Sequence, residues 1–415
     1  MFKGTLKPHQ VEGVEFGLHS PYHINGYQMG LGKTVIALYL ACKYKVNTLI
    51  VVPSYLKPNW IAEIEKFVET TGREFNIVVV SYTGLKKMFQ VGSLYKFDFI
   101  IADEAQYLKN KEAQRTQAFH NLVKEMRPKY LSLLSGTPVK NRVSEFWSLL
   151  QLCHYGGNYN EFNSFNKLYY KFCNTFSYER TFEINGVPIV RFDGVKNAEN
   201  LKALIKPVYI RKRTSDVAEL PDESEVYVKG KCLKKYANDL ENAFKLFDQD
   251  PNDPAYMSLK RANAMAKVKD TISLAKDILE QGEKVIIYSD HVAPAEEIAR
   301  ALGLPCVTGK VQAEKRGQIV VDFESHKYDL RNKKFNGIVA TIGSLSTGVN
   351  LVSARHMIFN DIPFVPTDID QAKARIKRIG QKRKCFYHFI YTSEFDKGLY
   401  EMVKRKDKDI RKIYD

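Results

Sequence analysis

Residues 29–34, which read Met-Gly-Leu-Gly-Lys-Thr, constrain the fold of this chain more than any other feature of its sequence. The two glycines allow the backbone to curl so that consecutive N–H groups face phosphate oxygens. Lys33 can then reach the β- and γ-phosphates of a nucleotide, and the Thr34 hydroxyl can bind Mg²⁺. Apolar side chains at helical spacing follow, so the phosphates would lie at a helix N-terminus, where the dipole favours anions. The expected ATP contacts come from Met29, Gly30, Leu31, Gly32, Lys33 and Thr34.

An acidic motif, Asp103-Glu104-Ala105-Gln106, follows about seventy residues later. Residues 97–102 read as a buried strand whose end presents Asp103 to the same Mg²⁺ and Glu104 to the water that attacks the γ-phosphate. A glycine-rich loop alone is often a plain turn, and an Asp-Glu pair alone is often a solvated surface. Together they predict an ATP-hydrolysing site, although Tyr27 at the first position makes the match to G-x-x-x-x-G-K-[ST] partial.

The overall composition favours an intracellular protein with a polyanionic partner. A chain of 415 residues is long enough for two domains with full cores, and its net charge of +16 fits nucleic acid better than a membrane. The alternative is a basic surface that only confers solubility. The six cysteines have no C-x-x-C spacing, which indicates neither zinc nor disulfides, and no apolar stretch approaches a membrane span. We therefore expect a cytoplasmic location.

Short apolar strands alternate with amphipathic helices in two series, a pattern typical of parallel sheets covered by helices on both faces. The expected strands are residues 48–52, 77–80, 97–102 and 130–134 in the first series, and 285–288, 338–341, 357–360 and 386–391 in the second. The sequence thus predicts an α/β protein with two lobes. The first comprises residues 1–222 with a helical and hairpin insertion at about 143–208, and the second comprises residues 223–415 with a helical insertion at about 233–268.

Residues 181–192 predict a β-hairpin, because Asn185-Gly186 at their centre is a strong type I′ turn signal. One interpretation is an edge ornament, since Pro188 suits an exposed edge strand. The other is a rigid pin beside a moving duplex, whose aromatic tip could stack on an unpaired base.

Other segments occur in an order that resembles the Swi/Snf-type branch of the superfamily 2 helicases, and within it the annealing, HepA-related helicases. The resemblance covers residues 6 to about 412 and is carried by Leu6-Lys-Pro-His-Gln10, residues 48–54 with Trp60, residues 103–110, Leu134-Ser-Gly-Thr-Pro-Val-Lys-Asn141, residues 209–221, Ser346-Thr-Gly-Val-Asn-Leu351 and Gln371-Ala-Lys-Ala-Arg-Ile-Lys-Arg-Ile-Gly-Gln381. It implies two RecA-like lobes of the P-loop NTPase class.

The resemblance also implies roles for individual residues. Gln10 would read the adenine, and Arg375 and Arg378, three apart on one expected helical face, would act as arginine fingers on the transferring phosphoryl group. Further ATP contacts would come from Gln106, Gly348 and Asn350. DNA contacts would come from Pro53, Ser54, Trp60, Ser81, Thr137, Ser346 and Thr347.

Two departures from the family pattern concern the coupling between ATP and DNA. Members usually carry Asp-Glu where this chain has Tyr27-Gln28, and His where it has Gln106. Neither change touches Lys33 or Glu104, so hydrolysis itself should survive.

The resemblance implies a DNA-dependent ATPase that uses ATP and Mg²⁺ and remodels duplex, forked or four-way DNA, acting as a monomer in a bacterial or phage-infected cell. Two alternatives remain open: a strand-separating helicase for RNA or single strands, and an ATP-gated DNA clamp that does not hydrolyse ATP. Preferred junction, polarity and protein partners are not encoded in recognisable motifs.

Overall fold

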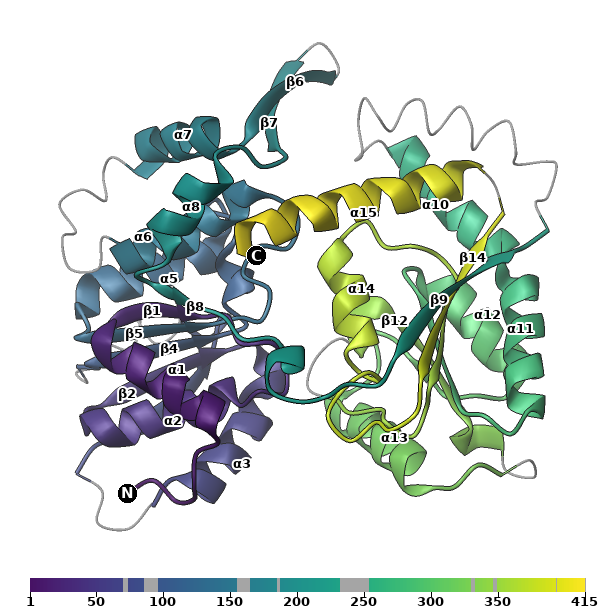
Figure 1. Cartoon of the computed structure of the whole chain (residues 1–415), viewed down its shortest axis with the longest axis horizontal. Coiled ribbons are helices and arrows are strands. Elements are labelled where there is room, and N and C mark those ends of the chain that lie inside the picture. The colour runs from purple at the N-terminus through teal and green to yellow at the C-terminus, as the bar shows by residue number, and fades with distance from the viewer. Residues whose placement is uncertain are drawn as a thin grey trace. The chain divides into compact units, whose positions relative to one another are not determined.

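The computed structural model describes residues 1–69, 74–85, 96–154, 165–184, 187–231, 254–329, 333–345, 349–392 and 394–414. The chain divides into two compact units, each built around one twisted sheet (Figure 1). Unit 1 comprises Met1–Arg180, Val190–Ala218 and Lys408–Asp415, and unit 2 comprises Thr181–Ile189 and Glu219–Asp407. Within the described ranges, no helix combines the length and the apolar character needed to cross a membrane.

The sheet of unit 1 has six parallel strands in the order β3-β2-β4-β5-β1-β8. The strands are β1 (Tyr22–Asn25), β2 (Thr48–Val52), β3 (Ile77–Ser81), β4 (Phe99–Asp103), β5 (Tyr130–Leu134) and β8 (Tyr209–Ile210). The central strands are apolar on both faces because helices cover both.

Successive side chains of each strand contribute to opposite layers of the core. Ile50, Phe99 and Ile101 pack with α1 (Pro8–His19), α2 (Lys33–Tyr44) and α3 (Lys57–Phe67). The opposite face carries Leu49 and Ile100. It packs with α5 (Gln114–Met126), α6 (Trp147–His154), α7 (Phe165–Phe176), α8 (Ala198–Ile205) and the last turns of α15 (Glu394–Tyr414).

The sheet of unit 2 also has six parallel strands, in the order β11-β12-β10-β13-β14-β9. These are β9 (Glu223–Lys229), β10 (Val285–Ser289), β11 (Cys306–Val307), β12 (Gly337–Thr341), β13 (His356–Phe359) and β14 (Cys385–Tyr391). One face packs with α11 (Val268–Glu280) and α12 (Val292–Leu302). The other packs with α13 (Ala313–Ser325), α14 (Pro366–Lys373) and the first turns of α15.

The predicted fold class is confirmed: two parallel-sheet lobes with helices on both faces of each sheet. All eight predicted strands exist, with bounds shifted by at most two residues. Among the described residues, four further strands were not predicted, namely β1, β8, β9 and β11. β8 and β11 are only two residues long, and β9 alternates exposed with half-buried side chains.

The predicted hairpin is present as β6 (Tyr178–Ile184) paired with β7 (Val187–Asp193). Its expected turn at Asn185-Gly186 lies outside the described residues, as do residues 233–253 of the expected second insertion. The described part of that insertion contains α10 (Pro254–Ala266).

Candidate nucleotide site and nucleic-acid interface

The strand order of unit 1 brings the three main motifs to one edge of the sheet. β5 lies between β1 and β4, and Leu134 at its end is in register with both Asn25 and Asp103. The loop after β1, the acidic pair that ends β4 and the segment after β5 therefore meet at the carboxyl edge, which is where parallel α/β sheets bind ligands.

The glycine-rich loop has the backbone conformation that its glycines predict. Gly30 and Gly32 have φ angles of +84° and +82°, and Gly32 caps α2 so that Lys33 is the first helical residue. A Cβ atom on Gly32 would lie only 2.2 Å from Nε2 of Gln10. Any side chain at position 32 would therefore both strain the loop and collide with the amide, which requires glycine there.

The segment before the loop packs directly against it. A ring nitrogen of His9 lies 3.1 Å from the carbonyl oxygen of Leu31, and Gln10 accepts the Lys7 N–H at 2.9 Å. Gln10, whose side chain is buried, thus has its Oε1 fixed by the backbone and its Nε2 directed at Gly32. The predicted adenine reader and the phosphate loop are parts of one packed unit.

The departures at positions 27 and 28 have structural roles. Tyr27 is fully buried and donates its hydroxyl to the His9 carbonyl at 2.7 Å, while its own carbonyl accepts Lys33 Nζ at 2.7 Å. Gln28 accepts the Thr214 N–H at 2.8 Å. An uncharged pair therefore holds the loop between α1 and the segment that follows β8.

Asp103 is held by donors that fix its carboxylate toward the site. Trp60 donates its indole N–H at 2.8 Å, and the Glu104 N–H donates at 2.9 Å. Burial, followed by the negative charge of Glu104, raises the pKa of Asp103 to about 6, while Trp60 and Lys33 act in the opposite direction. A carboxylate whose pKa is raised by desolvation is a group that a cation would stabilise. Hard oxygen donors such as Asp103 and Thr34 are the type that Mg²⁺ prefers, so these residues fit the predicted metal.

Glu104 adopts a left-handed backbone conformation with a φ angle of +50°, which is rare for a residue with a side chain. The side chain of Glu104 is oriented by Gln106. The Gln106 amide donates to the Glu104 carboxylate, and its oxygen accepts the Ser135 hydroxyl at 2.5 Å. Ser135 in turn accepts the Thr137 N–H at 3.2 Å. One buried amide therefore connects the predicted base to the segment after β5.

The predicted DNA-contacting residues of unit 1 divide into exposed and buried groups. Ser54 is exposed and Ser81 half-exposed at the ends of β2 and β3, and the exposed Thr83 lies 3.5 Å and 3.0 Å from their respective hydroxyl oxygens. Thr83 was not predicted, although it directly follows a predicted strand. Pro53 is buried, and Thr137 is partly exposed beside the Gln106 network.

The expectation that Trp60 contacts DNA is wrong for this structure. Its side chain is 0% exposed and its only polar atom is bonded to Asp103. Apolar packing of α3 on the sheet draws the indole into the core, so Trp60 positions Asp103 instead.

In unit 2, α14 ends at Lys373, and residues 374–380 form turns, so the expected helical face through Arg375 and Arg378 is wrong. Arg375 is 2% exposed and donates to the Val349 carbonyl at 3.2 Å, which fixes it inside the lobe. Arg378 is half-buried, and desolvation lowers its pKa. Asn350 is exposed, whereas Ser346, Thr347 and Gly348 lie outside the described residues.

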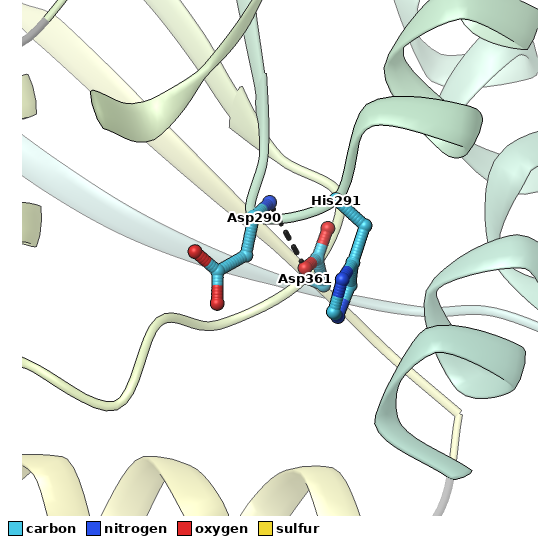
Figure 2. A group of neighbouring side chains, drawn as sticks. All are labelled: Asp290, His291 and Asp361. Atoms are coloured by element: carbon cyan, nitrogen blue, oxygen red, sulfur yellow. Dashed lines mark hydrogen bonds between the residues drawn. The ribbon is translucent and has the colours of Figure 1, made fainter. Parts of the chain in front are cut away.

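A polar cluster that the sequence did not single out lies at the carboxyl ends of β10 and β13 (Figure 2). Potential ligand atoms of Asp290, His291 and Asp361 all lie within 4.8 Å of one another. Lys260 forms an ion pair with Asp290 at 2.5 Å, and Asp361 accepts the Ser289 hydroxyl at 2.5 Å and the Asp290 N–H at 3.0 Å. Because these carboxylates already have partners, the cluster is a hydrogen-bonded support for the two strand ends.

The two parallel-sheet lobes, with the glycine-rich loop beside an acidic pair, define the class of two-lobed P-loop NTPases. Sequence profiles give the family: the SNF2-related domain matches residues 9–235, and the helicase conserved C-terminal domain matches residues 267–380. The chain belongs to the SNF2-related family.

Relatives from several organisms align over nearly all of the chain. A SWI/SNF-related matrix-associated actin-dependent regulator of chromatin subfamily A-like protein 1 homolog of Caenorhabditis elegans is 26% identical over 97% of this chain and 61% of its own length. The bovine DNA annealing helicase and endonuclease ZRANB3 is 24% identical over 97% of this chain and 40% of its own length. The chain therefore spans only part of these relatives.

Two further alignments cover most of this chain and most of the protein with which it is compared. The uncharacterized ATP-dependent helicase YqhH of Bacillus subtilis is 26% identical over 99% of this chain and 80% of its own length. The solved SWI2/SNF2 ATPase core of Sulfolobus solfataricus in complex with double-stranded DNA is 22% identical, with a TM-score of 0.43 over 99% of this chain and 97% of that one.

Proposed function

We propose that this protein is a DNA-stimulated ATPase that moves along DNA and remodels forked or branched structures. The observation that carries the proposal is the Gln106 bridge between Glu104 and Ser135. It gives the predicted catalytic base a hydrogen-bonded connection to a segment outside the nucleotide loop. A nucleotide-binding site without turnover has no use for such a connection.

The chain's residues divide the chemistry of hydrolysis among them. The glycine-rich loop and Lys33 would hold the phosphates, and Glu104 would orient and deprotonate the attacking water. Bound Mg²⁺, held by Thr34 and Asp103, would supply charge neutralisation at the phosphates. Arg378 suits a finger role better than Arg375 does, because Arg375 is buried against the Val349 carbonyl.

The DNA-facing part of the proposal depends on charge and on hydroxyl groups. The net charge of +16 favours phosphate contacts that do not depend on sequence. Ser54, Ser81 and Thr83 gather hydroxyls at the carboxyl ends of β2 and β3, where they can donate to backbone phosphates. The forked or branched substrate is supported by relatives whose names describe DNA annealing helicases.

Two alternatives make different predictions. A helicase for RNA or single strands shares the same site and would be stimulated most by those polymers. A clamp that does not hydrolyse ATP would need neither a strained Glu104 nor the amide that orients it.

The test is a comparison of phosphate release with single-stranded, duplex, forked and four-way DNA and with RNA. The proposal expects the highest rates with duplex-containing DNA and a further rise with forks or junctions. Stronger stimulation by RNA or single strands would favour the helicase alternative, and no release with any polymer would favour the clamp.

A further inference from the structure

Unit 1 contains a cavity of about 460 Å³ that takes no part in the proposed hydrolysis. Its walls come from the segment after the acidic motif, from η3 (Val143–Phe146), from the start of α6, from the middle of α7, and from β7. All lining residues belong to unit 1 and to its described parts. The volume lies in the range of pockets that bind small organic groups.

One wall is aromatic. Tyr169, Tyr170 and Phe192 lie with ring centroids 5.5 to 6.3 Å apart, and the Tyr170 ring is stacked on neither neighbour. Tyr170 is 54% exposed although it lines the cavity. It therefore offers a flat apolar surface to a planar group that enters from solvent. Phe192 is buried and makes edge contacts with both tyrosine rings, so it supports this wall.

The other walls carry charges that are already paired. Lys109 bonds Glu145 at 2.8 Å, Arg142 bonds Asp193 at 2.8 Å, and Lys111 bonds Glu112 at 2.5 Å while lying 4.8 Å from the Tyr169 ring centroid. Cations held by carboxylates are poor primary sites for phosphate. The ion pairs do provide donors, from their lysine and arginine N–H groups, and acceptors, from their carboxylates, around a neutral, polar ring. An aromatic wall beside lysines is the pattern that proteins use to stack unpaired bases.

The cavity is built from the same segments that form the nucleotide site. Lys109 directly follows η2 (Ala105–Leu108), which carries Gln106. Glu145 accepts the N–H groups of Lys140 and Asn141, each at 2.9 Å, and so holds the end of the segment that begins with Ser135. A group that fills the cavity would contact both segments that Gln106 bridges.

We propose that this cavity binds one unpaired DNA base, which stacks on Tyr170 and is bordered by the polar groups of the opposite wall. The inference rests on the proposed function, since an unpaired base occurs at the forks and junctions on which the protein would act. It assigns to the α7 and hairpin insertion the task of distinguishing a fork from a plain duplex. The base is recognised by its aromatic face, so little sequence preference is expected.

The test compares three DNA probes: a fork with an intact unpaired arm, a fork whose unpaired arm is abasic but keeps its phosphates, and a blunt duplex. The protein should bind the intact fork at least about 5-fold more tightly than the abasic fork, a ratio that corresponds to the lower end of the free-energy range for stacking one base on an aromatic ring. Tyr170→Ala should reduce this ratio to about 1 and leave the affinity for the blunt duplex unchanged. Tyr170→Phe should keep the ratio.

Tyr178→Ala is the matched control, because Tyr178 is 55% exposed on β6 and does not line the cavity. The proposal is overturned if the wild-type protein binds the two forks equally well, or if Tyr170→Ala still prefers the intact fork. It is also overturned if Tyr178→Ala reduces the affinity ratio as much as Tyr170→Ala does. In these cases duplex-stimulated ATP hydrolysis would persist. Absence of any DNA-stimulated hydrolysis would instead overturn the proposed function itself.

Discussion

Gln106 offers the sharpest test of how hydrolysis is coupled to the rest of the first lobe. Its amide is 4% exposed and joins the Glu104 carboxylate to the Ser135 hydroxyl. Gln106→Leu keeps the approximate volume but removes both hydrogen bonds. A hydrogen bond to a charged group is worth about 1.5 to 3 kcal/mol. If that energy orients Glu104 in the transition state, the DNA-stimulated kcat should fall by about 10- to 150-fold.

The assay is steady-state phosphate release at saturating duplex DNA, with nucleotide binding measured in parallel. Gln106→Leu should still bind ATP, because Lys33 and the glycine-rich loop are unchanged. Gln106→His introduces the residue that the family pattern has at this position. It should recover most of the rate, because one ring nitrogen can donate to Glu104 and the other can accept from Ser135. Wild-type turnover by Gln106→Leu would show that the bridge does not orient the base.

Three further predictions concern the second lobe, the DNA interface and stability. The Arg378→Ala variant should still fold and bind ATP, but its DNA-stimulated rate should fall by about 10³-fold or more. Arg375→Ala should instead lower the free energy of unfolding by about 1.5 to 3 kcal/mol. Equal melting temperatures and equal rates in the two variants would contradict a catalytic role for Arg378 and a structural role for Arg375. Affinity for duplex DNA should fall log-linearly with salt and vary little with sequence, and a flat titration would refute electrostatic docking. Burial lowers the pKa of His23 to about 4, so the folded state holds this ring neutral, and stability should fall as pH drops from 6.5 toward 4. His23→Gln should weaken that dependence in urea unfolding, and an unchanged dependence would contradict the assignment.

The fold was largely predictable because buried parallel strands leave a strong local signal. Continuous apolar runs such as Thr48–Val52 and Tyr130–Leu134 were predicted with their observed bounds. Strand β9 was missed because its sequence, Glu-Ser-Glu-Val-Tyr-Val-Lys, has no continuous apolar run and becomes a strand by pairing with β14. Such pairing is a tertiary effect that local propensity does not encode.

The residues of the candidate site were predictable where the backbone conformation determines their geometry. They were less predictable where the packing of helices on the sheets determines it. Positive φ angles at Gly30 and Gly32 follow from their residue type. The burial of Trp60 and the end of α14 before Arg375 depend on how helices meet the sheets. Thr83 became a candidate only when the ends of β2 and β3 were brought together.

The most direct test of the central claim, that Glu104 activates water for DNA-stimulated ATP hydrolysis, is phosphate release with forked DNA by wild type, Lys33→Ala and Glu104→Gln. Wild type should be stimulated by the DNA. Lys33→Ala should fail because it binds the phosphates weakly, and Glu104→Gln should bind ATP without releasing phosphate. Turnover by Glu104→Gln at the wild-type rate, with Lys33→Ala inactive, would contradict the assignment of the base.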